Sequence, residues 1–344
     1  MIGQQNAARA GVMAGGIFIV DHTKIIDRYP EPESLAEIGD SYRSNGGGPF
    51  NLLVDLARLA AAIPLEAVGR VGDDSDGEWI LSRCRSCGID VSQLRATPAA
   101  TTSSTDVMTE RATGRRTFFH CPGANALLDV DDFDLSRSSA RLLYFGYPTL
   151  LAHLDARHSQ EGTRAAELLR RARAAGFTTC VDFVTAPAER LAAVAPAILR
   201  HTDICLMNEL EAERVTGIAL RHGDRLVAER LDDAAQALIE LGVTSCAVIH
   251  APEGAHVRAR TGETARIGSV RVPREQIVGT AGAGDAFAAG FLMVWHQGGA
   301  LDAALRAGAA AAAVCLLDAT TSEGLRPLSE CLAFADAHGY RPAP

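Results

Sequence analysis

The chain has 344 residues, of which 47% are hydrophobic and 22% are charged, and it carries a formal net charge of −9 at pH 7. This composition is ordinary for a folded globular protein and excludes a largely disordered one. The acidic balance disfavours nucleic acid and anionic membrane surfaces as partners, because both repel a negatively charged protein.

The sequence shows neither the pattern of a targeting signal nor that of a reactive or metal-binding cysteine pair. The longest apolar run, residues 309–317, is about half of the ~18 residues that a membrane-spanning helix needs. The first residues lack the basic and then apolar order of a secretory signal, so we predict a cytoplasmic protein with a loose leader over residues 1–11. The one close cysteine pair, Cys84 and Cys87, has no second pair to complete a metal site, and we predict structural thiols.

Short apolar segments alternate with amphipathic ones along most of the chain. The elements predicted in chain order are a strand over 12–20, a helix over 49–59, a strand over 65–71, a helix over 73–87, a strand over 141–145, a helix over 162–175, a strand over 177–183, a helix over 187–200, a strand over 203–207, helices over 209–216 and 231–241, a strand over 245–250, a hairpin over 256–272, and helices over 284–296, 301–318 and 329–338. Such alternation is typical of a mostly parallel sheet with helices on both faces, so we predict an α/β fold.

Two segments interrupt the alternation. Residues 37–43 and 101–120, the latter turning at Thr113-Gly114, are β-like without intervening helices and are predicted to form a small antiparallel sheet that projects from the main body. No repeat or low-complexity linker divides the chain. We therefore expect one domain over residues 12–340, with the two segments inserted in it.

The most informative stretch is Gly279-Thr280-Ala281-Gly282-Ala283-Gly284-Asp285, which directly precedes an apolar helix. Small residues let backbone N–H groups turn inward, and the helix N-terminus adds unpaired donors and partial positive charge. Such a turn favours charge that builds up on a transferring phosphoryl group. Asp285 falls in the first helical turn, where a carboxylate can accept the proton of a substrate hydroxyl. The alternative is a tight turn in which Asp285 only caps the helix.

Two common nucleotide-binding motifs do not fit this stretch. A Walker A loop needs a following Gly-Lys-Ser/Thr, which is absent, and a dinucleotide-binding fingerprint belongs to the first strand of a βαβ unit rather than to a position after a late hairpin. A nicotinamide-dependent dehydrogenase is therefore a poor interpretation.

At this point the sequence resembles the ribokinase-like (PfkB) carbohydrate kinases. Four segments carry the resemblance in the family's order: residues 45–51 (NGGGPFN), 68–74 (VGRVGDD), 208–213 (NELEAE) and 282–287 (GAGDAF). Together they span nearly the whole chain. The resemblance implies a ribokinase-like fold in which the small sheet is a lid. It also implies transfer of the γ-phosphoryl group of ATP, with Mg²⁺, to a hydroxyl of a small sugar-like molecule.

The resemblance also implies roles for individual residues. The catalytic base would be Asp285, and the anion hole would be formed by the backbone of Gly282, Ala283 and Gly284. The substrate-binding residues would be Asp21, Gly46, Gly47, Asn51 and Tyr147. The nucleotide-binding residues would be Asn208, Glu211, Ile249, Ala251, Gly254, Thr280 and Gly284, with Glu211 reaching the metal ion through water.

Several positions depart from the family pattern. Gly279 replaces a common Asp that belongs to the monovalent-cation site of some members, so we expect little activation by potassium. Ile19 replaces a polar substrate contact of ribokinases, which argues against ribose as the acceptor. Ile249 and Ala251 replace a usual polar residue and a usual glycine in the nucleotide-binding loop.

Two other functions stay open. Phe50, Phe118, Phe119 and Tyr147 could form an aromatic wall for a base, which makes a nucleoside kinase one alternative. The departures from the family pattern make a non-catalytic ligand-binding member another. A catalytic protein is favoured because Asp285 and the glycines before it are intact.

The lid carries two further implications. In many members of the family the lids of two chains pair across a two-fold axis, so the resemblance implies a homodimer through the lid. Arg115 and Arg116 lie on this lid and could hold a phosphate of the substrate. Neighbouring strand residues point to opposite faces, however, so one of the two is expected to face solvent.

Overall fold

The structure is a computed structural model that describes residues 9–344. Most of the predicted leader, residues 1–8, therefore lies outside the described residues. Within the described part, no helix combines the length and the apolar character that crossing a membrane requires.

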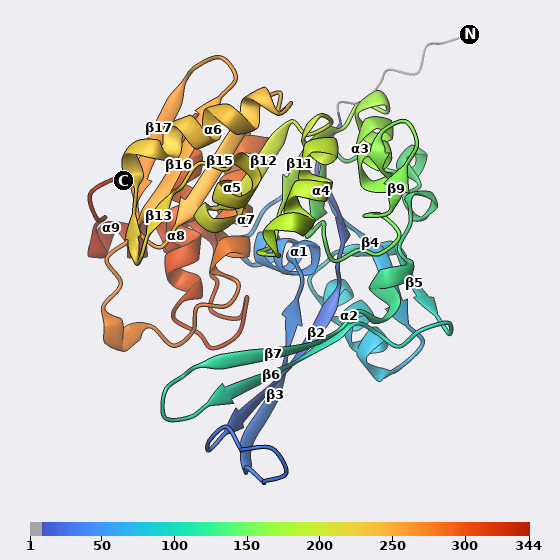
Figure 1. The fold of residues 1–344 in the computed structure, drawn as a ribbon, viewed down its shortest axis with the longest axis vertical. Helices are drawn as coiled ribbons and strands as arrows, with labels where there is room; N and C mark the ends of the chain where they lie inside the picture. The colour runs from blue at the N-terminus through green and yellow to red at the C-terminus, as the bar shows by residue number, and fades with distance from the viewer. Residues whose placement is uncertain (1–8) are drawn as a thin grey trace.

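The main body is built on a nine-stranded sheet with the order β17-β16-β15-β12-β11-β8-β1-β4-β5 (Figure 1). Its strands are β1 (Val12–Gly16), β4 (Leu65–Gly72), β5 (Asp90–Thr97), β8 (Leu142–Gly146), β11 (Thr178–Asp182), β12 (Ile204–Asn208), β15 (Cys246–Ala251), β16 (Gly254–Ala259) and β17 (Thr264–Gly268). Neighbours from β5 to β15 run parallel, and β16 and β17 extend the sheet in antiparallel fashion. The predicted mostly parallel sheet is confirmed. The edge strand β5 is an addition that the sequence pattern did not predict.

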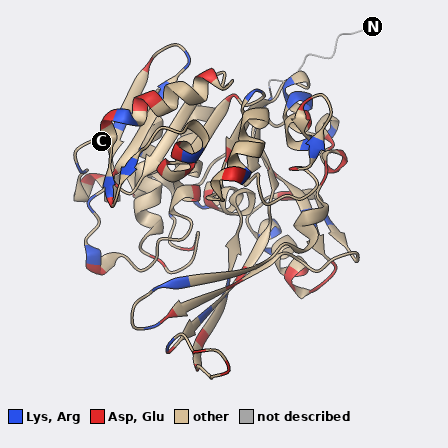
Figure 2. Cartoon of the chain, viewed as in Figure 1, with Lys and Arg blue, Asp and Glu red and all other residues tan. Residues whose placement is uncertain are grey.

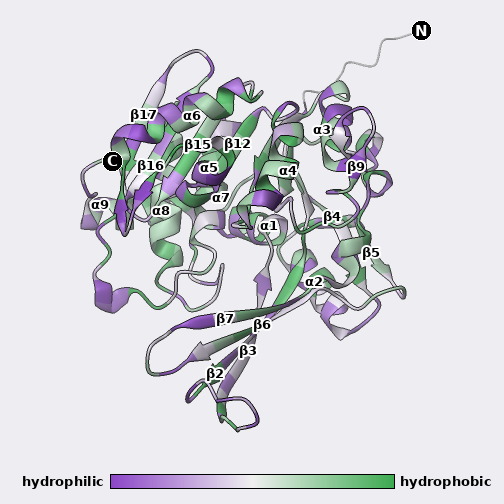
Figure 3. Ribbon diagram, viewed as in Figure 1, coloured by the Kyte–Doolittle hydropathy of each residue, from purple (hydrophilic) through white to green (hydrophobic). Residues whose placement is uncertain are grey.

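Helices cover both faces of this sheet, as predicted. They are α1 (Gly48–Arg58), α2 (Ser75–Ser86), α3 (Arg164–Ala174), α4 (Ala188–Leu199), α5 (Glu209–Thr216), α6 (Leu231–Glu240), α7 (Ala283–His296), α8 (Leu301–Cys315) and α9 (Leu328–His338). Buried side chains form two cores: one is shared with α1, α2, α7, α8 and α9, and the other with α3, α4, α5 and α6. The middle strands between these layers are hydrophobic (Figure 3), because both of their faces are covered.

A separate four-stranded sheet projects from the main body, with the order β3-β2-β6-β7 (Figure 1). Its strands are β2 (Ile19–Ile26), β3 (Ile38–Gly46), β6 (Ser104–Glu110) and β7 (Arg116–Cys121). The predicted projecting sheet is confirmed, but the prediction that it is antiparallel is wrong for one pair, because β2 and β6 run parallel. We call this sheet the lid.

The strand predicted over residues 12–20 is in fact two strands that belong to different sheets. β1 ends at Gly16, whose φ of 133° lets the chain leave the main sheet. The side chain of Asn125 then holds the connection, since its Oδ1 accepts from the Phe18 N–H (3.2 Å) and its Nδ2 donates to the Phe18 carbonyl (3.0 Å). β2 continues from there into the lid.

Short elements complete the described chain. They are the small hairpins β9 (Arg157–His158) with β10 (Gly162–Thr163) and β13 (Arg221–His222) with β14 (Arg225–Leu226), and the 3-10 helices η1 (Gly123–Leu127), η2 (Val130–Asp132), η3 (Leu135–Arg137), η4 (Ala228–Arg230) and η5 (Arg274–Gln276). Figure 2 shows that charged residues of both signs gather on helices, loops and the lid, while the middle strands of the large sheet carry few.

The carboxyl ends of the parallel strands define where a ligand can bind. β1 lies where the order of the sheet reverses, with β4 and β5 on one side and β8 to β15 on the other. Ligands of such sheets bind beyond the carboxyl ends of the strands near the reversal. Polar side chains gather at that edge: Asp182 ends β11, Asn208 ends β12 and Tyr147 follows β8.

Candidate active site

Asp285 lies in the first turn of α7, and this helix begins directly after Gly282, which has a left-handed backbone (φ 78°). Its carboxylate is 5% exposed and accepts two hydrogen bonds, from Asn51 Nδ2 (2.8 Å) and from the Tyr147 hydroxyl (2.8 Å). Burial raises the pKa of Asp285 to about 6, and these two hydrogen bonds hold it from rising further. At neutral pH the group is thus mainly a carboxylate, held in one orientation and able to accept a proton.

A second asparagine fixes the orientation of Asn51. Asn45 Nδ2 donates to Asn51 Oδ1 (2.7 Å) and to Ser322 Oγ (2.8 Å), and the Thr321 hydroxyl donates to the Asn45 carbonyl (2.6 Å). Since Asn51 Oδ1 accepts, its amide nitrogen must face Asp285. This network joins the lid strand β3, helix α1 and the loop after α8. The sequence reasoning missed Asn45, Thr321 and Ser322, of which only Asn45 had a signal, its place directly before the double glycine.

Tyr147 reaches Asp285 from an unusual backbone conformation. Its φ is 64°, a value that costs a non-glycine residue energy and that recurs at functional sites. Its N–H donates to the Asp182 carbonyl (2.9 Å), which anchors the turn after β8 to the neighbouring strand. Tyr147 was predicted to bind substrate; its hydroxyl donates to Asp285, and the hydroxyl oxygen can still accept a hydrogen bond.

Asp182 is a second buried carboxyl beside Asp285. Its Oδ2 accepts from the Tyr144 hydroxyl (2.6 Å). Burial, and then the charge of Asp285, raise the pKa of Asp182 well above its usual range. The sequence reasoning did not single out Asp182, although an acidic residue at the end of an otherwise uncharged strand is a recognisable signal.

Asp21 and the double glycine lie together on the lid side of the site. A Cβ atom on Gly46 would come within 2.6 Å of both Asp21 carboxylate oxygens, and one on Gly47 (φ 89°) would collide with the Ile17 carbonyl. Both positions therefore exclude a side chain. The absence of side chains at Gly46 and Gly47 lets the Asp21 carboxyl lie close to the start of α1, the helix that carries Asn51.

The pKa of Asp21 depends on its burial and on the groups around it. Burial raises the pKa to about 7, the Thr105 hydroxyl lowers it, the charge of Asp285 raises it and the Arg116 guanidinium lowers it. Of the predicted site residues, the structure thus groups Asp21, Asn51 and Asp285 at one edge of the sheet, and such a group can bind and deprotonate a hydroxylated molecule.

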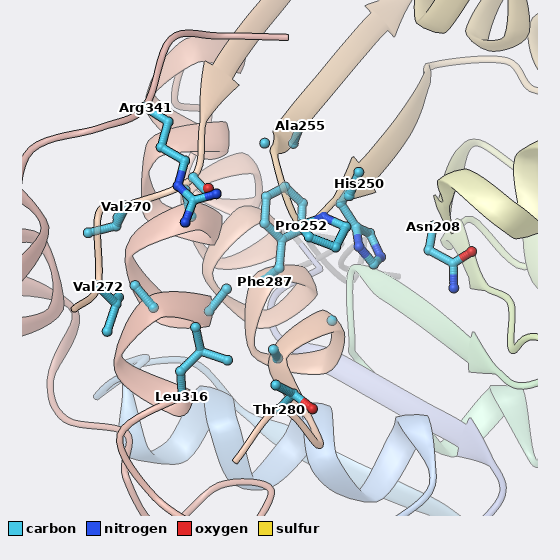
Figure 4. Close-up of a pocket in the computed structure, with 18 of the residues that line it drawn as sticks. Asn208, His250, Pro252, Ala255, Val270, Val272, Thr280, Phe287, Leu316 and Arg341 are labelled. Atoms are coloured by element: carbon cyan, nitrogen blue, oxygen red, sulfur yellow. The ribbon is translucent and has the colours of Figure 1, made fainter. Parts of the chain in front are cut away.

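A cavity of about 530 Å³ adjoins this group at the start of α7 (Figure 4). It is lined by Asn208, Glu209, Leu210, His250, Ala251, Pro252, Gly254, Ala255, Ser269, Val270, Val272, Ile277, Thr280, Ala283, Gly284, Phe287, Ala309, Ala312, Ala313, Leu316 and Arg341. Small side chains of α8 leave room there for a flat ring, and Arg341 points in from the C-terminal segment. The size is that of a small-molecule site.

Most of the predicted nucleotide-binding residues line this cavity. Asn208, Ala251, Gly254, Thr280 and Gly284 all do so. Glu211 and Ile249 do not, and the prediction for Ile249 is corrected because its side chain is fully buried in the core. Strand residues alternate, so the next residue of β15, His250, faces the cavity in its place. Burial lowers the pKa of His250 to about 4, and its ring, 5.4 Å from that of Phe287, is neutral at neutral pH.

Glu211 lies behind Asn208 rather than in the cavity lining. Its carboxylate accepts from the Asn208 N–H (2.9 Å), from Asn208 Nδ2 (2.7 Å) and from the Thr185 hydroxyl (2.9 Å). Burial raises the pKa of Glu211 to about 7. Residues 9–344 contain no group of three His, Cys, Asp or Glu side chains that could hold a metal ion by themselves. Glu211 therefore orients Asn208.

The comparison with known protein families decides what kind of molecule this is. The family model described as pfkB family carbohydrate kinase matches residues 12–327. The chain belongs to the pfkB family of carbohydrate kinases. The match runs from β1 to the residue before α9, so it includes the lid and every residue of the two sites described above except Arg341.

Relatives of this pfkB-family kinase include proteins named for different sugars. The ATP-dependent ribose-1-phosphate kinase of Halopiger xanaduensis is 28% identical over 297 residues, which cover 86% of this chain and 88% of that protein. The 5-dehydro-2-deoxygluconokinase of Shouchella clausii is 27% identical over 301 residues (85% and 86%). A probable fructokinase of Arabidopsis thaliana is 28% identical over 269 residues (75% and 72%).

Solved structures confirm the fold. A ribokinase of Arabidopsis thaliana, solved with ribose and ATP, superposes with a TM-score of 0.78 at 21% identity, covering 95% of this chain and 99% of that one. A ribokinase of Thermotoga maritima gives a TM-score of 0.77 at 20% identity, covering 95% and 99%. The predicted ribokinase-like fold with a lid is therefore correct for this kinase.

The aromatic wall predicted from the sequence does not assemble. Phe50 is fully buried and packs against Phe18, with ring centroids 5.6 Å apart. Phe118 and Phe119 are 59% and 56% exposed on the lid, and consecutive strand residues face opposite sides of a sheet. The observation that favoured a nucleoside acceptor is thereby lost.

Proposed function

We propose that this kinase transfers the γ-phosphoryl group of ATP to a hydroxyl of a small sugar or sugar derivative, with Asp285 as the catalytic base. The observation that carries the proposal is the buried Asp285 carboxylate, aligned by Asn51 and Tyr147 between the acceptor side, with Asp21, and the nucleotide cavity. The relatives named as ribose-1-phosphate kinase, 5-dehydro-2-deoxygluconokinase and fructokinase support a carbohydrate acceptor.

The proposed step follows from these positions. The acceptor oxygen attacks the γ-phosphorus, its proton passes to Asp285, and the bond between that phosphorus and the bridging oxygen of ADP breaks. The backbone N–H groups of residues 282–284 open α7 and point at the space where the transferred group carries charge. Asp21 and the backbone at Gly46 and Gly47 would orient the sugar, and Asn51 would hold the base.

The nucleotide is proposed to occupy the cavity of Figure 4, with its phosphates toward Thr280 and Gly284. Mg²⁺ fits this site, since it keeps several waters and binds mainly to nucleotide phosphates rather than to a protein cage. Asn208, with Glu211 behind it, would face its water shell. When bound, the ion neutralises phosphate charge. The cytoplasm, where ATP is available, stays the predicted compartment.

Replacement of Asp285 by Asn tests the proposal. The amide keeps the shape of the side chain but cannot take a proton, so kcat should fall about 10²-fold or more while ATP affinity stays within about threefold. ADP release from a panel of sugars measures kcat, and titration calorimetry measures ATP binding. A wild-type protein that binds ATP but phosphorylates no sugar would instead favour a non-catalytic family member.

We also propose that the chain forms a homodimer through the lid. The lid and the loop that joins β2 to β3 expose large apolar side chains, among them Leu35 (78%), Ile38 (50%) and Phe119 (56%), which is typical of a protein–protein contact. Analytical ultracentrifugation of the wild type and of Phe119→Glu measures this. A monomeric wild type at micromolar concentration would rule the dimer out.

A further inference from the structure

The lid carries a guanidinium group without a counter-ion next to the acceptor side of the site. From its surroundings we infer that the acceptor bears an anionic group, a phosphate ester or a carboxylate, and that Arg116 binds it. The inference deepens the proposed function and rests on it, because it names the class of acceptor for the same site.

Most basic side chains of the lid and its connecting loop are already paired with carboxylates. Lys24 pairs with Asp106, Arg111 with Asp40 (3.2 Å), Arg28 with Asp27 (2.6 Å) and Arg43 with Asp76 (3.6 Å). Arg116 is different: no carboxylate of residues 9–344 lies within ion-pair distance of it, and its guanidinium makes no hydrogen bond to them. It is also half-buried, whereas Arg115 is exposed. An unpaired, partly desolvated guanidinium is costly unless a ligand supplies the charge.

Strand geometry puts Arg116 on the same side of the lid as Asp21. In the lid register Asp21 pairs with Thr105 and Thr105 pairs with His120, and the Thr105 hydroxyl lies 3.2 Å from His120 Nδ1. Alternate residues of one strand share a face of the sheet, and Arg116 precedes His120 on β7 by an even number of residues. The side chain of Arg116 therefore lies on the same face of the lid as that of Asp21.

Gly279 leaves the space that the guanidinium occupies. A Cβ atom at position 279 would lie 3.0 Å from Arg116 Nη2, so a side chain there would push the arginine away. A cavity of about 480 Å³ separates the two segments, lined by Gly114, Arg116 and Phe118 of the lid and by residues 277–281 of the turn before α7. The hairpin β6–β7 crosses below the main body toward this turn (Figure 1).

The charges of the site explain why an arginine is needed there. Asp21 and Asp285 repel an anionic acceptor, and a neutral sugar would need no cation. A guanidinium at the far side of the acceptor site offsets this repulsion and binds carboxylate or phosphate oxygens with two parallel N–H groups. The proposed nucleotide cavity has its own donors at the start of α7, and Ile277 and Thr280 line both cavities.

Matched acceptors and matched variants test the inference. The acceptors are ribose with ribose 1-phosphate, glucose with glucose 6-phosphate, and glucose with gluconate. The variants are Arg116→Ala, Arg116→Lys and, as a control on the same hairpin, Arg115→Ala. ADP release gives kcat and KM for each acceptor and for ATP, and thermal shift without nucleotide gives acceptor binding.

We expect an anionic member of the panel to be preferred by the wild type. Arg116→Ala should raise KM for that member on the order of 10- to 100-fold and abolish its thermal shift, with KM for ATP unchanged. Arg116→Lys should recover part of the loss, and Arg115→Ala should behave as wild type. The two anionic classes distinguish a phosphate from a carboxylate.

Other results overturn the inference. If neutral sugars are preferred, or if Arg116→Ala affects neutral and anionic acceptors equally, Arg116 does not select the acceptor, and the proposed kinase function still stands. If Arg116→Ala raises KM for ATP instead, the arginine serves the nucleotide. If no sugar of any class is phosphorylated, the proposed function fails, and this inference fails with it.

Discussion

The two sides of the cleft are built in different ways. On the acceptor side, Asp285, Asn51 and Asn45 form a buried hydrogen-bonded chain. On the nucleotide side, the cavity is lined mainly by small and apolar residues, such as Ala309 and Ala312, and has few side-chain hydrogen bonds. The first side fixes one geometry for chemistry, and the second supplies a shape that many residues could provide.

This difference has an energetic consequence. Buried polar networks are sensitive to single changes, because removing one partner leaves another buried group unsatisfied at a cost of about 1–3 kcal/mol. Apolar cavities respond mainly to volume. Substitutions on the acceptor side should therefore change catalysis and its pH dependence, whereas those on the nucleotide side should change ATP affinity alone.

The largest of these effects is expected from Asn51→Ala. The change removes a donor from the Asp285 carboxylate and an acceptor from Asn45, so kcat/KM for the acceptor should fall about 10- to 100-fold and the free energy of unfolding by about 1–3 kcal/mol. Steady-state kinetics and urea unfolding measure the two quantities. Ala57→Ser, on the same helix, is the control. Normal kinetics in Asn51→Ala would show that Asp285 does not depend on this network.

The pH dependence gives the next largest effect. As the proposed base, Asp285 can accept a proton only when it is deprotonated, so its pKa of about 6 should make kcat/KM fall as pH drops through that value. The Tyr147 hydroxyl lowers this pKa, so Tyr147→Phe should raise it. The acidic limb of the pH profile, where kcat/KM falls, should then move to higher pH. Profiles of kcat/KM from pH 5 to 9 test the direction of this shift, and Tyr29→Phe, a change at an exposed tyrosine, is the control. A limb that moves to lower pH, or does not move, would contradict the assignment.

A smaller and separate effect is expected on the nucleotide side. Ala312→Leu puts a larger side chain into the cavity and so leaves less room for the nucleotide. It should raise KM for ATP about tenfold, with kcat at saturation and the acidic limb of the pH profile unchanged. Ala303→Leu, on the exposed face of the same helix, should leave all three unchanged. A change of the acidic limb in Ala312→Leu would mean that the two sides of the cleft are not independent.

The smallest effect is expected from potassium. Position 279 has no side chain to hold a cation, and the Arg116 guanidinium beside it repels one, so replacing tetramethylammonium by potassium should change kcat by less than about twofold. The comparison is made at constant ionic strength. A strong activation by potassium would show that other oxygens of the site bind the ion.

The pattern of small residues and the alternation of apolar segments were enough to predict much of this molecule. Residues 282–285 and the apolar helix that follows predicted a phosphate-binding turn, and the alternation predicted the layered sheet. Both signals are local, since the preference for a turn or a helix depends on neighbouring residues. The edge strand β5 and the break at Gly16 were missed because pairing with a distant strand, not local pattern, decides them.

What the sequence by itself determined is the class of fold and the family signature, and it predicted Asp285 as the base. Only the tertiary structure decided that Tyr147 and Asn51 align this carboxylate, that His250 rather than Ile249 faces the nucleotide cavity, and that Arg116 lies beside Gly279. The physical reason is that hydrogen bonds and charge interactions act over a few ångströms in space, whatever the separation along the chain, and strand register and side-chain direction set that distance.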